Sequence, residues 1–157
     1  MTLDPKTALR LQFLARVVRK ECRHLAITDS RLFESLFEVA QLEEDPDLAE
    51  RVDAFVVRFG RLQDTIGDKL LPLLLATLGE KISSAMDNLD RAERLGLLKS
   101  ADEWMTIRKL RNQMIHEYVE DPALLTNALQ TAHFFVPELI AIADKMIAEI
   151  EQRGWAG

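Results

Sequence analysis

Side chains suited to one kind of chemistry stand together in a single short segment, Arg111-Asn112-Gln113-Met114-Ile115-His116-Glu117-Tyr118. RNA carries its own nucleophile, the ribose 2′-hydroxyl, so a protein can cleave it without a metal ion. An imidazole can remove the proton from that hydroxyl near neutral pH. A guanidinium can bind phosphate oxygens through two parallel hydrogen bonds and stabilise the charge that builds up on phosphorus. The segment therefore predicts RNA cleavage by Arg111 and His116, with a 2′,3′-cyclic phosphate and a free 5′-hydroxyl as products.

The spacing of these residues predicts how a helix would present them. A helix turns by about 100° per residue, so Arg111 and Tyr118 lie almost one above the other. Asn112 and His116 form a neighbouring row. Arg111 and His116 are five positions apart, which is about 140° around the axis, so one helix does not aim both at one phosphate. We therefore expect two copies to meet across a twofold axis as a homodimer with a composite cleft.

The overall charge limits how the chain can bind RNA. The 157 residues carry a formal net charge of −6, from 20 basic and 26 acidic side chains. Coating nucleic acid requires a surplus of Lys and Arg at the surface, so a general nucleic-acid coating protein is excluded, whereas locally focused charge still allows RNA as a substrate. Basic residues are in excess over 1–27, where a stripe at helical spacing is read as a solvated face, with RNA guidance or partner docking as the alternative. The stripe consists of Arg16, Arg19, Lys20 and Arg23.

Cysteine usage and apolar runs indicate the compartment. Cys22 is the only cysteine. We expect neither an internal disulfide nor a cysteine-rich metal site, and the predicted chemistry needs no metal ion or cofactor. The N-terminus lacks the long apolar core of a signal peptide, and the apolar run Leu70–Leu78 is too short to span a bilayer. The sequence therefore predicts a cytoplasmic protein that does not insert into a membrane.

Apolar residues recur every three or four positions along most of the chain, which is typical of helices. One such seam consists of Leu48, Val52, Phe55, Phe59, Leu62, Ile66 and Leu73. A second consists of Leu125, Ala128, Ala132, Phe135, Leu139, Ile142 and Met146. Long helices joined by short loops favour an all-α antiparallel bundle that forms a single domain over 1–157. We predict helices over 5–26, 30–43, 46–78, 81–95, 100–118 and 122–152.

Several residues mark where these helices begin and end. Asp45 and Asp121 each precede a proline, which predicts an acidic N-cap followed by proline in the first helical position. Ser100 is a predicted N-cap, and Gly96 is a predicted C-cap for the helix before it. Pro72 removes a hydrogen-bond donor inside the long predicted helix 46–78, so we expect a kink there.

The pattern Arg-Asn-x-x-x-His-x-Tyr at 111–118 resembles the signature of HEPN-domain proteins, specifically the HepT-like ribonuclease toxins of type VII-style toxin–antitoxin pairs. The similarity is strongest over 50–150, where it includes the run Arg-Phe-Gly-Arg-Leu-Gln-Asp at 58–64 and the approach from Trp104 to Arg111. Residues 1–45 match less clearly. The resemblance implies a small HEPN-like helical fold, a homodimer, and RNA cleavage without a metal ion. It also implies a minimal nucleotidyltransferase antitoxin as the partner.

The same resemblance implies a role for each polar residue of the motif. Arg111 and His116 would be catalytic, and Asn112 would orient one of them. The antitoxin would attach AMP to Tyr118 and so silence the toxin. The added phosphodiester would lie beside Arg111, occupy its guanidinium and block the cleft. On residue type alone Tyr118 is instead an amphipathic residue with its ring on the core, and only the motif favours modification.

Further basic residues lie near the motif and in the helix before it. Arg58, Arg61, Arg108 and Lys109 are candidate RNA contacts. Alternatively, Arg58 and Arg61 can contact the catalytic side chains and hold them in position. Arg61 and Asp64 can equally form a surface pair three residues apart, which contributes little to stability.

A function from a different class is also compatible with the sequence. The chain could be a non-catalytic subunit that holds a nucleotide or another substrate for a separate nucleotidyltransferase. The acidic net charge favours this reading slightly, whereas the intact motif favours the ribonuclease, because a scaffold has no need for a base beside a cation. His24 and His133 have no evident partners in the sequence, and we assign them structural roles.

Overall fold

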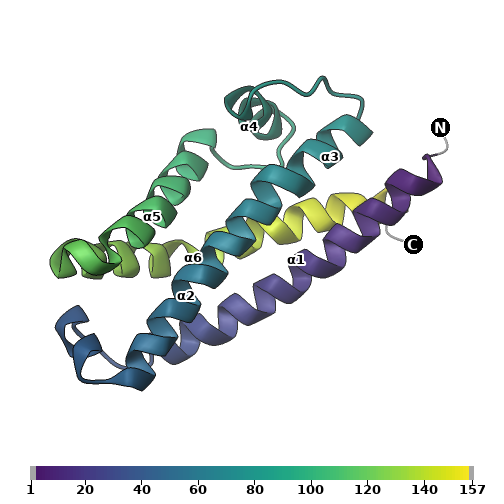
Figure 1. Cartoon of the computed structure of the whole chain (residues 1–157). Coiled ribbons are helices and arrows are strands. Elements are labelled where there is room, and N and C mark those ends of the chain that lie inside the picture. The colour runs from purple at the N-terminus through teal and green to yellow at the C-terminus, as the bar shows by residue number, and fades with distance from the viewer. Residues whose placement is uncertain (1–2, 156–157) are drawn as a thin grey trace.

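The computed structural model describes residues 3–155, apart from the side chains of 117–120, and over this range it is helical without any strand. The long helices pack side by side into a bundle, and α4 lies across one end beside α3 (Figure 1). Both chain ends lie at the same end of the bundle. The predicted all-α bundle is therefore confirmed. In chain order the elements are α1 (Pro5–Leu32), η1 (Val39–Glu43), α2 (Pro46–Asp64), η2 (Thr65–Leu70), α3 (Leu71–Thr77), α4 (Ala85–Arg94), α5 (Ala101–Glu120) and α6 (Pro122–Gln152).

The predicted helix ends are confirmed where a local capping residue determines them. Asp45 accepts a hydrogen bond from the Leu48 amide at 3.0 Å, and Asp121 accepts from the two amides that follow its proline. Ser100 Oγ accepts from the amide three residues later at 3.1 Å. Gly96 has a φ of 79°, the left-handed conformation of a helix C-cap. These caps fix where α2, α5 and α6 begin and where α4 ends.

The predicted helix over 30–43 is wrong. α1 continues to Leu32, and only the short 3₁₀ turn η1 follows before α2. The Phe33 ring instead packs edge-on against Phe55 at 5.3 Å and stacks on His133 at 4.0 Å. Asp29, near the end of α1, points to the His133 ring, with Oδ1 2.6 Å from Nδ1. Contacts with α2 and α6 therefore determine the conformation of this segment, and these contacts cannot be predicted from the local sequence.

The predicted helix over 46–78 is continuous along the chain, but its hydrogen bonding changes at η2, a π turn. The Leu71 amide donates to the Ile66 carbonyl five residues earlier, and Pro72, which has no N–H, follows at once. A π turn contains one residue more than a turn of α-helix, so the buried face shifts by one position along the chain. Leu70 at the end of the turn and Leu71 directly after it are buried, whereas Leu73, which the regular seam predicts to be buried, is only half-buried. The irregularity expected at Pro72 is thus a π turn placed before it.

Two glycines allow α5 to approach α2 and η2 closely. A Cβ atom on Gly67 would lie 2.8 Å from Trp104 Cζ2, and one on Gly60 would lie 3.2 Å from Arg111 Nε. The glycines are seven residues apart, and so are the two α5 residues that they face, in the opposite chain direction. A helix repeats its face about every seven residues, so one glycine-bearing face receives one face of α5. This contact positions Arg111, the first residue of the predicted motif.

A carboxylate lies buried between α1 and η2. Glu21 is only 9% exposed, and Thr65 Oγ1 donates to its carboxylate at 2.9 Å. Burial raises the pKa of Glu21, because the charged form loses water, and this effect outweighs the lowering by the Thr65 hydrogen bond and by Arg61 and Lys69. The ionised carboxylate therefore reduces the stability of the fold at neutral pH.

Gly67→Ala should lower the free energy of unfolding by about 1–3 kcal/mol, because the new methyl group would overlap the Trp104 ring. At an ordinary helix position Gly→Ala is stabilising, so the sign of the change in the free energy of unfolding shows whether the close contact exists. Chemical denaturation measures the effect. The matched control is Gly67→Ala in a Trp104→Phe background, where the smaller ring should reduce the cost. An equal cost in both backgrounds, or a stabilisation, would contradict the close contact.

Glu21→Gln should raise the melting temperature near pH 7.5 and change it little near pH 4. The folded-state pKa of Glu21 is raised above its ordinary value of 4.5, so its contribution to stability is complete below that value and is lost as the pH rises through the folded-state pKa. Glutamine still accepts from Thr65 but carries no charge. Glu50→Gln at an exposed position of α2 is the control and should leave the pH dependence unchanged. A lower melting temperature for Glu21→Gln near pH 7.5 would refute the assignment.

Candidate active site

Arg111 is held between α5 and α2 by contacts on three sides. Its Nη2 donates to Asp64 Oδ2 at 3.0 Å, its Nη1 donates to Asn112 Oδ1 at 3.1 Å, and its aliphatic stem lies against Gly60. Its Nε is buried and has no partner among the described residues. Each terminal nitrogen of a guanidinium carries two N–H groups. The guanidinium is therefore fixed in place and keeps N–H groups free to bind an anion.

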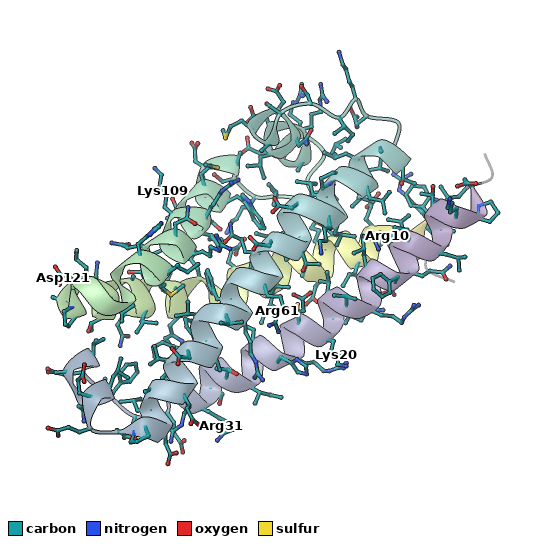
Figure 2. The ribbon with its side chains drawn as sticks, viewed as in Figure 1. Arg10, Lys20, Arg31, Arg61, Lys109 and Asp121 are labelled. Carbon is teal, nitrogen blue, oxygen red and sulfur yellow. The ribbon has the colours of Figure 1, made fainter. Side chains whose placement is uncertain are left out.

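Asp64 contacts Arg111 at the candidate site, and the sequence does not identify it as a site residue. The sequence offers Arg61 as its partner three residues away, but the structure pairs Asp64 with Arg111 across the helix interface. The aspartate is half-exposed and the arginine is about one-third exposed, so water screens the pair only in part. Arg61 is exposed on α2 (Figure 2). The sequence signal that could have indicated this pairing is Gly60, which opens the space that the Arg111 stem fills.

His116 lies on the exposed surface of α5, four residues beyond Asn112. Arg111 and Asn112 are thus joined by a hydrogen bond, whereas among the described residues no hydrogen bond or ion pair joins His116 to either of them. Within one chain the two predicted catalytic groups do not converge. Tyr118, the predicted site of AMP attachment, has a side chain outside the described residues.

The other basic residues of the predicted set fall into two groups. Arg58 donates to the His24 carbonyl and to the Thr28 hydroxyl, so it ties α2 to α1. Arg108 and Lys109 are exposed on α5, and Lys109 points away from the bundle (Figure 2). Arg58 therefore has a structural contact, whereas the α5 pair is free to meet a ligand.

Two hollows lie on either side of the Arg111–Asp64 pair, and both residues line each of them. The first has a volume of about 350 Å³ and lies between α5, the α2–η2–α3 segment and α4. The second has a volume of about 420 Å³ and includes Arg61 and Lys69 in its lining. The ion pair is therefore a ridge between two depressions, one of which carries extra positive charge.

The remaining candidate groups do not join this site. The His133 ring is bound by Asp29 and stacked on Phe33, which gives it the structural role assigned from sequence together with partners that the sequence did not reveal. Burial raises the pKa of the Cys22 thiol to about 12, so it is not a nucleophile. The described part of the chain contains no cluster of three or more His, Cys, Asp or Glu residues that could hold a metal ion. None of its helices is both long enough and apolar enough to cross a membrane.

The candidate site is defined by its geometry and by the motif at 111–118. The geometry consists of a fixed arginine on a ridge, an exposed histidine on the same helix, and a hollow on each side. Comparisons with protein-family models, with curated proteins and with solved structures found no match for this chain.

Proposed function

We propose that this protein is a metal-independent endoribonuclease of the toxin type, in which Arg111 binds the scissile phosphate and His116 acts as the general base. The observation that carries the proposal is the guanidinium of Arg111. Asp64 and Asn112 hold it at the surface between two hollows, on the same helix as an exposed imidazole. A fixed cation of this kind stabilises charge that develops during a reaction, because it needs no reorganisation at that moment.

The chemistry proceeds by attack within the RNA. His116 takes the proton of a 2′-hydroxyl, and the resulting oxygen attacks the adjacent phosphorus. Arg111 stabilises the added negative charge on the phosphate oxygens. The bond to the 5′-oxygen breaks, and that oxygen takes a proton from water or from a second imidazole. The products are a 2′,3′-cyclic phosphate and a 5′-hydroxyl, so no electron acceptor or metal ion is required.

Asp64 acts in this scheme as a positioning residue. A lone arginine on a helix surface samples many rotamers, and fixing it costs conformational entropy. The hydrogen bond to Asp64 fixes the Arg111 side chain before RNA binds. The negative charge of Asp64, however, weakens the attraction between Arg111 and the phosphate. Arg61 and Lys69, which line the adjoining hollow, restore positive charge along a path for the RNA backbone.

The site becomes complete in a homodimer. Arg111 faces α2 and His116 faces solvent, so a second copy is needed to bring an imidazole opposite a guanidinium. Apolar side chains lie exposed on α5 and α6, including Ile115 next to His116 at 48% and Leu124 at the start of α6. Phe134 on α6 is 76% exposed. Burial of such groups between two copies would stabilise the dimer.

The motif further supports a cytoplasmic partner of the minimal nucleotidyltransferase class that transfers AMP to Tyr118. Tyr118 is the only tyrosine in the chain, so modification of tyrosine can occur at no other position. Its place seven residues after Arg111 would bring the new phosphodiester near the guanidinium on an ideal helix. Occupation of that cation would then prevent RNA binding.

One observation favours a second candidate, a non-catalytic nucleotide-binding subunit of a nucleotidyltransferase. The 350 Å³ hollow beside Arg111 has the size of a small-molecule site. The two candidates differ when the protein is incubated with the partner nucleotidyltransferase and ATP. A mass gain of one or more AMP units on Tyr118 supports the toxin, whereas stable binding with neither modification nor RNA cleavage supports the subunit.

His116→Ala and Arg111→Ala should each reduce RNA cleavage by about 10²–10⁴-fold in EDTA while the melting temperature stays close to that of the wild type. Arg111→Lys should also lose most activity, because an ammonium cannot make the paired contact with phosphate. Cleavage of a labelled RNA by protein free of contaminating nuclease measures the effect. His24→Ala removes an imidazole on α1 and is the matched control, with activity unchanged. Full activity of His116→Ala would refute the mechanism.

A further inference from the structure

The 350 Å³ hollow beside Arg111 contains a buried polar group without a partner. Gln63 lines it and is only 4% exposed, and among the described residues nothing donates a hydrogen bond to its Oε1. A buried acceptor left unpaired costs about 1–3 kcal/mol, so it is usually satisfied by a protein group or a ligand. A hydrogen-bond donor that enters this cavity would satisfy Gln63.

Asn88 of α4 also lines the cavity, but its amide is hydrogen-bonded to the Ser83 backbone, so the remaining polar lining is divided between two segments. The α2–η2 segment supplies acceptors, namely the Gln63 amide oxygen and the carboxylates of Asp64 and Asp68. α5 supplies donors, namely the guanidinium groups of Arg108 and Arg111. The two pairs of opposite charges balance, so the cavity does not select strongly for an anion or a cation. It favours instead a neutral group with donors along one edge and acceptors along another.

The rest of the lining suits a flat ring. Trp104, which is buried against Gly67 and only 3% exposed, lines the cavity together with Leu71, Pro72 and Leu89, and these side chains contribute apolar contacts. Proteins read the edges of unstacked RNA bases by hydrogen bonds. An apolar part of the lining, together with acceptors on one side and donors on the other, matches a nucleobase.

Among the RNA bases, guanine fits this division best. Its O6 and N7 are adjacent acceptors that an arginine binds bidentately, which suits Arg108. Its N1–H and N2–H₂ groups are adjacent donors, which suit the Gln63 amide oxygen and the Asp68 carboxylate. Adenine places a donor beside N7 and so opposes the arginine. We propose that this cavity is a guanine-binding site, with the phosphate of the same or the neighbouring nucleotide at Arg111.

The guanine can belong to a free nucleotide or to an RNA strand. That it belongs to the RNA substrate, and so sets the preferred cleavage position, rests on the proposed ribonuclease function. The binding of the base itself does not rest on it. The experiment therefore has one arm for each source.

The first arm measures the binding of free nucleoside monophosphates to the full-length Trp155→Phe protein, in which Trp104 is the only tryptophan. GMP should quench Trp104 fluorescence and bind about tenfold or more tightly than AMP, CMP or UMP. Asp68→Asn at an exposed position and Gln63→Leu in the cavity should each reduce this preference by about tenfold. Lys145→Ala removes a positive charge at an exposed position of α6 that lines neither hollow, so it is the control and should leave GMP binding unchanged. Equal binding of all four nucleotides, or no binding, would overturn the proposal.

The second arm uses single-stranded RNA that contains one guanosine, with inosine or adenosine at that position in matched strands. The wild type should cut beside guanosine, and inosine, which lacks the 2-amino donor, should reduce cleavage by about fivefold or more. Cleavage without any preference for guanosine, together with no GMP binding, would overturn the guanine site and leave the ribonuclease standing. GMP binding in a protein that cuts no RNA would uphold the site and refute the proposed function.

Discussion

The close approach of α5 to the glycine-bearing face of α2 and η2 determines where the candidate site lies. Without side chains at Gly60 and Gly67, the Trp104 ring and the Arg111 stem can rest directly on the neighbouring helix. A small increase in side-chain volume at either glycine would displace α5, because protein interiors tolerate little added volume. The π turn of η2 contributes to the same contact, since Gly67 lies within it. The position of the guanidinium is therefore a consequence of helix packing.

Incomplete pairing of buried polar atoms is concentrated at this contact. Among the described residues three buried side-chain nitrogen or oxygen atoms have no hydrogen-bond partner, and two of them, Gln63 Oε1 and Arg111 Nε, belong to residues that line one cavity. Folded proteins satisfy most such atoms, and departures from this rule tend to mark functional positions. The Asp64–Arg111 pair adds a fixed charge of each sign at the rim. The site combines a fixed cation with unused hydrogen-bonding capacity, which suits binding of a polar ligand.

The sequence predicts those parts of the fold that local chemistry decides. Asp45, Ser100 and Asp121 cap their helices as predicted, because a capping side chain acts on amides two or three residues away. The helix predicted over 30–43 fails because Phe33 and Asp29 are engaged by α2 and α6, which lie far away in the chain. Similarly, the heptad-like seam predicts a buried Leu73, but the π turn shifts the register before that residue.

For the candidate site, the sequence likewise identifies the residues of a local motif but not those that helix contacts bring to it. Residue types and spacing identify Arg111, Asn112 and His116 as candidates, and the structure shows that His116 is exposed. They do not identify Asp64, because the sequence offers Arg61 as a nearer partner, and the choice between them depends on a helix contact. Gln63 is equally hidden, since an amide in an amphipathic helix is usually exposed and only the structure places it in a cavity.

The central claim is that an imidazole and a guanidinium direct the RNA's own 2′-hydroxyl against the neighbouring phosphate. The most direct measurement uses an RNA that the wild type cleaves in EDTA, remade with a single 2′-deoxy sugar on the 5′ side of the cleaved bond. The account predicts that this bond stays intact while other cleavage sites in the strand are cut as before. Cleavage at the deoxy position at the original rate would contradict it, because the proposed nucleophile would then be absent.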